Sequence, residues 1–283
     1  MTSPVKILVI NLRGSTERRD RMRRQLEALG LDFDFVDAVD GRGFDLATHP
    51  AYDGPRRRRA YGRDLSGGEL GCLLSHRSIY EKMLAEGLEQ VLVLEDDVIL
   101  GADFLAVLPS ILAASADCDV VRFLSARKIA RLRQRRVAPL AGGYWLARLE
   151  TTPGGAYAYL IRRRGAEKLL PFMQRNWLPV DTLMGRSWET GLRWLIVCPA
   201  LADYDRDIDP DISFSRYDKG ARRGGAGRLA YRLSRARFKL LETLGKRRVY
   251  WSAWAADRRG LKAARRERPD GALESRKSTT PFG

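Results

Sequence analysis

Three consecutive carboxylates, Glu95, Asp96 and Asp97, are the residues whose types and spacing are best suited to chemistry. They directly follow the apolar run 91–94, which predicts a strand that is covered on both faces. In open α/β sheets, ligands bind beyond the carboxyl ends of such strands. Adjacent acids repel one another, and a divalent cation with oxygen ligands relieves that repulsion, so the triplet predicts a Mg²⁺ or Mn²⁺ site. The alternative is a solvated turn or a helix N-terminus, where carboxylates are also favoured.

A strand and helix at the N-terminus should bring arginines to the same edge. Residues 5–11 predict a first strand, and Ser15 can cap a helix that Gly30 ends. Arg18 and Arg19 lie in the first turn of this helix, where the strand would open onto a ligand, and guanidinium groups suit phosphate oxygens. The alternative is that both arginines belong to a solvated helix face.

A second predicted strand, residues 33–36, ends in acidic residues beside a glycine. Asp37, Asp40 and Gly41 follow it. An acid just after an early strand can accept hydrogen bonds from sugar hydroxyls, so this edge can hold a ribose. The Asp40-Gly41 pair is equally an ordinary turn signal.

The S-x-x-E spacing of Ser66 and Glu69 predicts the start of a helix over about residues 68–86, because each side chain can satisfy a backbone donor there. Gly71, with a serine four residues later, would let this helix approach another backbone closely. His76 lies on the same helix, and a lone helix histidine is commonly structural.

Strand and helix signals alternate as far as a strand at residues 194–198, which indicates an α/β fold with helices flanking a mostly parallel sheet. Asp181 begins a further segment, where an ordinary N-cap is the alternative to a functional role. The alternating acids of residues 203–211 lack the central glycine and terminal glutamate of a calcium loop, so an exposed acidic loop is the preferred interpretation.

Composition divides the chain into two parts. Its 283 residues are 45% hydrophobic, enough for a sizeable core, and no apolar run reaches the length of a membrane span. Residues 219–268 hold 17 Lys and Arg against three acids, a net +14 of the total +16. We therefore expect a nearly neutral body, residues 1–218, and a basic tail, residues 219–283.

The tail predicts a basic amphipathic helix. Its apolar stripe comprises Leu229, Leu233, Ala236, Leu240 and Leu244, and its basic side comprises Arg228, Arg232, Arg235 and Lys239. Such a helix can lie in a membrane interface, with its cations drawn to anionic lipid. The alternative is a helix packed on the body with a solvated basic face.

The three cysteines, Cys72, Cys118 and Cys198, are scattered without the spacing of a zinc site or a disulfide framework. We expect them in the core of a protein from a reducing cytoplasm. The N-terminus shows no basic leader or cleavage site. With the basic tail, this predicts a peripheral protein on the inner face of a bacterial cytoplasmic membrane.

Four segments together resemble glycosyltransferase family 25, which includes bacterial lipooligosaccharide glycosyltransferases and the collagen galactosyltransferases. They are residues 9–12 leading to Arg18 and Arg19, residues 38–41, residues 65–76 and residues 94–98. The resemblance covers about residues 5–200 and does not include the tail.

The resemblance implies a GT-A-like α/β fold, a UDP-sugar donor, and Mn²⁺ or Mg²⁺ near the carboxylate triplet. It also places His76 near the active site. In this interpretation Asp97 is the principal metal ligand, Asp96 helps with the metal or the ribose, and Glu95 orients donor hydroxyls. Asp181 is the candidate general base. The expected donor-binding set is completed by Asn11, Arg18, Arg19, Asp37, Asp40 and Gly41.

The leading hypothesis is a hexosyltransferase that moves galactose or glucose from UDP to a hydroxyl of a lipid-linked surface glycan such as lipooligosaccharide. One rival is a nucleic-acid-binding protein, which the basic tail with its interleaved aromatic residues suggests. It explains the tail but not the body, so nucleic acid is not the expected partner. Another rival is a metal-dependent phosphoesterase, although such sites usually gather more acids and histidines.

Overall fold

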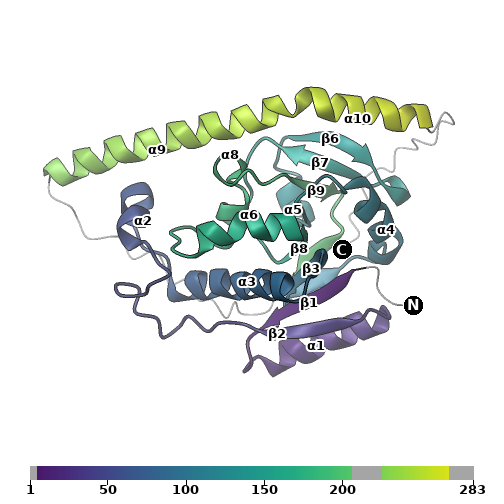
Figure 1. The fold of residues 1–283 in the computed structure, drawn as a ribbon, viewed down its shortest axis with the longest axis horizontal. Coiled ribbons are helices and arrows are strands. Elements are labelled where there is room, and N and C mark those ends of the chain that lie inside the picture. The colour runs from purple at the N-terminus through teal and green to yellow at the C-terminus, as the bar shows by residue number, and fades with distance from the viewer. Residues whose placement is uncertain (1–4, 206–224, 268–283) are drawn as a thin grey trace.

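The structure is a computed structural model that describes residues 5–205 and 225–267 (Figure 1). Its main strands are β1 (Lys6–Asn11), β2 (Phe33–Asp37), β3 (Gln90–Glu95), β5 (Val120–Arg122), β6 (Gln134–Pro139), β7 (Trp145–Leu149), β8 (Ala158–Arg162) and β9 (Trp194–Cys198). They form one eight-stranded sheet in the order β2-β1-β3-β8-β5-β9-β7-β6. Six strands run in one direction, and β7 and β8 run against them. The predicted α/β fold with a mostly parallel sheet is confirmed.

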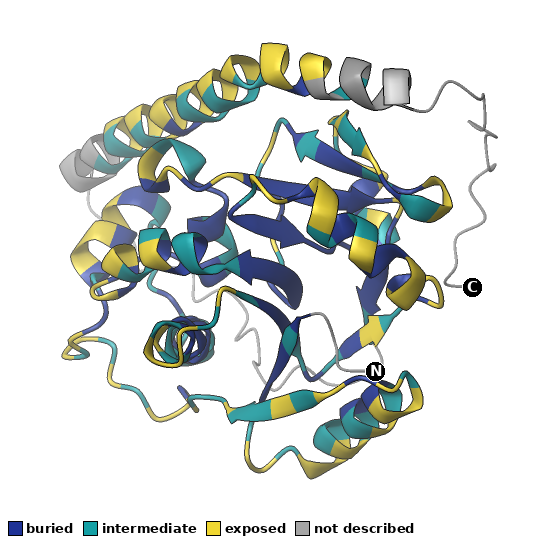
Figure 2. Cartoon of the chain, turned by 45° about the vertical axis from the view of Figure 1, so that its right-hand side comes forward, coloured by how far each residue is buried: buried dark blue, intermediate teal, exposed yellow. Residues whose placement is uncertain are grey.

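Helices cover both faces of this sheet. They are α1 (Thr16–Ala28), α2 (Gly54–Tyr61), α3 (Gly67–Ala85), α4 (Phe104–Ala114), α5 (Ala126–Ile129), α6 (Arg163–Met173), α7 (Val180–Met184) and α8 (Ser187–Thr190). Apolar residues of α3 and α6 pack on one face, and those of α1 and α4 pack on the other. Along β3, Val91 and Val93 face the first layer while Leu92 and Leu94 face the second. The apolar run before the carboxylates is therefore a strand buried on both sides, as predicted. The central strands of the sheet are coloured as buried in Figure 2.

The start of α3 confirms the predicted capping box. The hydroxyl of Ser66 accepts a hydrogen bond from the Glu69 amide at 3.0 Å, and the Glu69 carboxylate accepts one from the Ser66 amide at 2.8 Å. Two backbone donors that a helix N-terminus leaves unpaired are satisfied in this way. The capping box fixes where α3 begins and so sets the position of His76, three turns further along.

A small second sheet lies beside the carboxylate triplet. Strand β4 (Val98–Leu100) pairs antiparallel with β10 (Ala202–Tyr204). The amide of Asp205 then donates to the backbone carbonyl of Asp97 at 2.8 Å. Asp203 is buried and Asp205 is half-buried, which differs from the exposed acidic loop that we expected, and residues 206–211 of that loop lie outside the described residues.

The tail forms α9 (Gly225–Ser252) and α10 (Trp254–Glu267), which lie across the body along α2, α8 and β6 (Figure 1). The predicted helical tail is confirmed. The predicted boundary between body and tail, at residue 218, falls outside the described residues. Of the helices described, none is both long and apolar enough to cross a membrane.

Candidate active site

A cleft of about 800 Å³ opens at the carboxyl ends of β1 and β3. Its walls come from the loop of residues 38–42, the first turns of α3, the carboxylate triplet, the loop of residues 154–157 and the start of α7. The 154–157 loop reaches this edge because β8, which follows it, runs antiparallel to β3. Segments that are far apart in the sequence thus meet where α/β sheets bind their ligands.

The carboxylate of Asp96 is held from two sides. Asn11 Nδ2 donates to one oxygen at 2.7 Å, and Arg18 Nη1 donates to the other at 3.2 Å. Asp96 is buried, and burial raises the pKa of its carboxyl group while the bonds from Asn11 and Arg18 act against that rise. With both oxygens engaged, Asp96 is better placed to orient its neighbours than to bind a metal. Asn11, which does not line the cleft, acts through Asp96.

Asp97 is the carboxylate whose surroundings fit a cation. Its Oδ1 atom is buried and has no hydrogen-bond partner among the described residues. Burial and the neighbouring charges of Glu95 and Asp96 raise the pKa of Asp97 to about 7. A crowded carboxylate with an unsatisfied oxygen facing other acids is the environment that a hard divalent cation stabilises. The residues present therefore fit Mg²⁺ or Mn²⁺, with Asp97 favoured over Asp96 as ligand.

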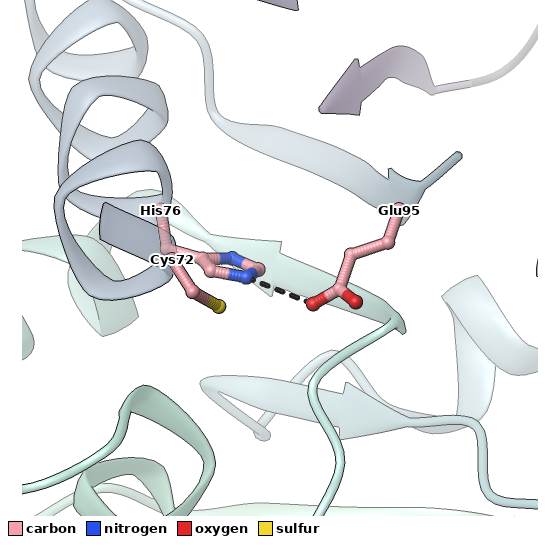
Figure 3. Close-up of side chains that lie close together, drawn as sticks. All are labelled: Cys72, His76 and Glu95. Carbon is pink, nitrogen blue, oxygen red and sulfur yellow. Dashed lines mark hydrogen bonds and ion pairs between the residues drawn. The ribbon is translucent and has the colours of Figure 1, made fainter. Parts of the chain in front are cut away.

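His76 joins α3 to the triplet (Figure 3). Its side chain is buried, with Nε2 3.2 Å from Glu95 Oε1 and Nδ1 2.7 Å from the hydroxyl of Tyr159. A carboxylate only accepts hydrogen bonds, so Nε2 is assigned the hydrogen, and Nδ1 of the neutral ring accepts from Tyr159. Burial raises the pKa of Tyr159 well above its usual value, which keeps that hydroxyl a donor. His76 is thus a buried residue that lines the cleft and contacts Glu95, and a part for it in the reaction stays a prediction.

Cys72 completes a cluster with this pair. Donor atoms of Cys72, His76 and Glu95 all lie within 4.8 Å of one another. Burial raises the pKa of the Cys72 thiol well above its usual value, which keeps it protonated and a poor ligand. The oxygen ligands around Asp97 are a better match for the expected cation than this cluster. Cys72 was expected in the core, and it instead lines the cleft.

Asp181 lines the opposite wall of the cleft, in the first turn of α7. Its Oδ2 accepts from the Gly155 amide at 2.7 Å, and its Oδ1 accepts from the Thr182 amide at 2.5 Å. It is not the N-cap of α7, which is Pro179. The carboxylate instead ties the 154–155 loop to α7 and faces the same cleft as the triplet.

The Asp40-Gly41 turn packs against α3 through glycines. A Cβ on Gly41 would lie 1.9 Å from the Gly67 carbonyl oxygen, and a Cβ on Gly71 would lie 2.6 Å from the Val39 carbonyl oxygen. Ser75 closes the contact, because its hydroxyl accepts from the Val39 amide at 2.9 Å and donates to Gly71 at 2.8 Å. The close backbone approach predicted for Gly71 is confirmed, and it places Asp40 and Gly41 in the cleft wall.

Gly71→Ala is expected to destabilise the protein by about 2–4 kcal/mol, because the new methyl group meets backbone atoms that cannot move aside. Urea unfolding measures this change. Gly43→Ala is the matched control, since a Cβ there meets nothing within 4 Å. Equal stability of the two variants would show that the turn and α3 do not pack this tightly.

Lys128 is a cleft residue that sequence reasoning missed. Its Nζ donates to the Gly154 carbonyl at 3.0 Å and lies 5.6 Å from the ring centres of Tyr157 and Tyr204. Burial lowers the pKa of this lysine. In the sequence it belongs to a run of basic residues that resembles a solvated loop. Its position depends on Ser125, which caps α5, and on the long-range contact with residue 154.

Besides Asn11, two predicted donor-binding residues do not line the cleft. Arg19 lies over the ring of Phe35, 4.1 Å from its centre, and donates to Asn11 Oδ1 at 3.4 Å. Asp37 is exposed and forms an ion pair with Arg13 at 2.6 Å. Arg19 is thus half-buried beside Asn11, and Asp37 is exposed at the end of β2.

Asp40 does line the cleft, together with its partner Arg42. Hydrogen bonds from Arg42 lower the pKa of Asp40 to about 2. The Arg42 Nε atom lies 2.9 and 3.0 Å from the two carboxylate oxygens. Asp40 is thus an anion at the cleft rim with its acceptor atoms partly occupied.

Fold and cleft together define an α/β protein whose carboxylate-bearing site lies at the carboxyl ends of its strands. The chain belongs to glycosyltransferase family 25, because residues 5–184 match the family described as "Glycosyltransferase family 25 (LPS biosynthesis protein)". The resemblance found in the sequence is thereby confirmed. The matched region contains every predicted site residue and excludes the tail.

Curated relatives agree with this membership. The human "Inactive glycosyltransferase 25 family member 3" is 32% identical over 198 residues, covering 63% of this chain and 31% of the relative. Human "Procollagen galactosyltransferase 2" is 30% identical over 196 residues, covering 63% of this chain and 29% of the relative. The chain thus spans about a third of the length of these relatives, and one of the two is named inactive.

Solved structures give distant similarities. A mannose-1-phosphate geranyltransferase from Thermus thermophilus is 13% identical with a TM-score of 0.38, covering 68% of this chain and 73% of its own. A glycosyltransferase involved in glycosylation of the major capsid of PBCV-1 is 12% identical with a TM-score of 0.34, covering 68% of this chain and 80% of its own.

Proposed function

We propose that this protein is a metal-dependent glycosyltransferase that transfers a hexose, galactose or glucose, from a UDP-sugar to a hydroxyl of a lipid-linked surface glycan. The observation that carries the proposal is the buried oxygen of Asp97, which has no partner among the described residues, in a cleft of about 800 Å³ that Glu95 also lines. A cleft of that volume suits a ligand the size of a nucleotide sugar. Family membership supports sugar transfer as the reaction.

The carboxylate wall is the metal and diphosphate side of the proposed site. Asp97 would hold Mn²⁺ or Mg²⁺, and Asp96 would be kept in place beside it by Asn11 and Arg18. The cation, when bound, neutralises charge that develops on the departing diphosphate. Lys128, on the facing wall, supplies a further positive charge for phosphate oxygens.

The glycine turn is the ribose side of the proposed site. Asp40 and Gly41 are fixed against α3, so their position does not depend on a mobile loop. A carboxylate there can accept hydrogen bonds from sugar hydroxyls. Glu95, oriented by His76, is placed to hold hydroxyls of the transferred sugar.

Asp181 is the proposed base on the acceptor side. The carboxylate would take the proton of the acceptor hydroxyl as that oxygen attacks the anomeric carbon of the donor. Two backbone amides hold it in one orientation, so it needs little reorganisation when the acceptor arrives. Asp181 and the triplet line the same cleft, which would have to hold both sugars.

A lipid-linked glycan is the proposed acceptor because the matched family is described as an LPS biosynthesis protein. A collagen acceptor is suggested by the name of one relative, procollagen galactosyltransferase 2, but that protein is about three times as long as the matched region. The bacterial glycan therefore takes precedence over collagen as the acceptor to be tested.

The test is a panel of UDP-sugars incubated with the full chain and Mn²⁺, with release of UDP as the readout. We expect UDP release from UDP-galactose or UDP-glucose, and its loss with EDTA. Release of UMP or inorganic phosphate instead would indicate a phosphoesterase. No product from any donor, in the presence of lipid-linked acceptors, would contradict the proposal and group this chain with its inactive relative.

A further inference from the structure

The outer side of the tail helices carries most of the exposed large hydrophobic side chains that the structure describes. Six of the nine lie there, and each of the six is more exposed than any of the three on the body, which are all 37% exposed. They are Leu233 (63%), Leu240 (59%), Leu241 (55%), Leu244 (53%), Trp251 (60%) and Trp254 (41%). Residues 233, 240, 244 and 251 are spaced so that they share one face of a helix. Figure 2 shows exposed residues along this side of α9 and α10.

The opposite side of the tail is fixed to the body. Phe238 packs against Tyr61 and Trp177, with ring centres 5.4 and 5.6 Å apart. Gly245 lies so close to Trp188 that a Cβ would be 2.5 Å from the indole. The residues that pack on the body, at positions 238, 245 and 249, lie on the side of the helix opposite the exposed leucines. The tail therefore presents its apolar row outward as a rigid surface.

This arrangement rules out the alternative given for the tail. That alternative was a helix packed on the body with a solvated basic face, which would turn the apolar stripe inward. Instead the predicted stripe members Leu233, Leu240 and Leu244 are exposed. Arg235, from the predicted basic side, donates to the Ala60 carbonyl of the body at 3.3 Å. Leu229 and Arg228 lie where side chains are not described.

The charged side chains of the tail are distributed unequally between the side that meets the body and the side that faces away from it. Asp257 is buried against the body and forms ion pairs with Arg135 and Arg148 at 2.5 and 2.9 Å. Glu242 is also buried, paired with Lys239 and Lys246 at 2.8 and 3.0 Å. The exposed arginines are Arg232, Arg237, Arg247, Arg248, Arg258 and Arg259. Over residues 231–259, where the tail's side chains are described, no acid reaches the outer face.

We propose that the outer face of α9 and α10 binds the surface of an anionic phospholipid membrane, with the helices parallel to the bilayer plane. The exposed leucines and tryptophans would enter the boundary between headgroups and acyl chains, and the flanking arginines would contact lipid phosphates. A second copy of the chain is a poorer occupant, because a symmetric contact would bring arginines against arginines with no acid between them. Nucleic acid would use the arginines but leave the leucines in water.

Vesicle flotation with the full chain tests the proposal. We expect binding to vesicles that contain phosphatidylglycerol, weak binding to phosphatidylcholine alone, and loss of binding at high salt. The Arg247→Glu/Arg248→Glu variant should lower the partition coefficient by about tenfold or more, and Leu240→Ser/Leu244→Ser by about tenfold. All four positions are exposed, so unfolding curves should match the unmodified chain.

The matched control is Arg24→Glu/Arg175→Glu, which makes the same change in charge at exposed positions of the body. It should bind vesicles nearly as well as the unmodified chain. Equal losses in the control and the tail variants, or equal binding to neutral and anionic vesicles, would overturn the proposal. A dimer in sedimentation velocity that becomes a monomer in the leucine variant would also overturn the proposal. Displacement of the protein from vesicles by a single-stranded oligonucleotide would do the same. Failure here would leave the proposed sugar transfer untouched, since that is measured with UDP release.

Discussion

Asp97→Asn is expected to lower sugar transfer by about 10³-fold or more while leaving the free energy of unfolding unchanged or higher. The substitution keeps the shape of the side chain and removes one of three crowded negative charges. Asp97 Oδ1 has no partner among the described residues, so replacing that oxygen by an amide nitrogen breaks no hydrogen bond. Steady-state transfer assays and urea unfolding on the same preparation separate the two effects.

Asp117→Asn is a suitable control for this variant, because Asp117 is exposed and outside the cleft. It should change neither activity nor stability. Near-native turnover by Asp97→Asn in Mn²⁺ would remove Asp97 from the reaction. A large loss of stability in that variant would mean that Asp97 stabilises the fold. That result would not be expected of a carboxylate whose Oδ1 atom has no partner among the described residues.

Asp181→Asn is expected to lower turnover by about 10²- to 10⁴-fold and to change donor affinity by only a few-fold. An amide cannot take the proton of the acceptor hydroxyl. Its remaining oxygen can still accept from the Gly155 amide, so the loop that Asp181 ties to α7 should keep its position, whereas the hydrogen bond from the Thr182 amide is lost. Saturating turnover and the affinity for UDP are the two quantities to compare.

Thr182→Val serves as the comparison, since it removes only the hydroxyl contact to Asp181 at 3.2 Å. We expect a loss of less than tenfold. If Asp181→Asn weakened UDP binding and left saturating turnover unchanged, Asp181 would be a donor-side residue that positions the 154–155 loop. Another group would then have to be the base.

Local signals predicted the elements that carry the site. The apolar run before Glu95, the capping box at Ser66 and the strand before Asn11 each depend on neighbours in the chain, and all three are as expected. The meeting of these elements also followed, since parallel strands bring their carboxyl ends to one edge. This is why the carboxylates, Arg18 and Asp40 could be grouped in advance, whereas His76 was placed with them only by the family resemblance.

The remaining features depend on contacts between distant residues. Arg18 and Arg19 are adjacent, yet Arg18 reaches Asp96 while Arg19 turns to Phe35, and helix periodicity cannot choose between them. Lys128 is one cation in a basic run, and only its contact with Gly154 brings it into the cleft.

The tail shows the same limit. Its amphipathic pattern was visible in the sequence, but the side that meets the body is set by buried partners such as Arg135 for Asp257. Those partners lie in β6 and β7, more than 100 residues earlier in the chain. A helical wheel alone therefore could not decide which side of the tail packs on the body.

The proposed function requires that the cleft at the ends of β1 and β3 holds a divalent cation together with a nucleoside diphosphate. Calorimetric titration of the full chain with UDP, in Mn²⁺ and then in EDTA, tests it most directly. We expect binding in Mn²⁺ that falls at least about tenfold both in EDTA and in Asp97→Asn, because Asp97 would hold the cation that contacts the diphosphate. Equal UDP affinity with and without the metal, or in Asp97→Asn and the unmodified chain, would contradict the claim.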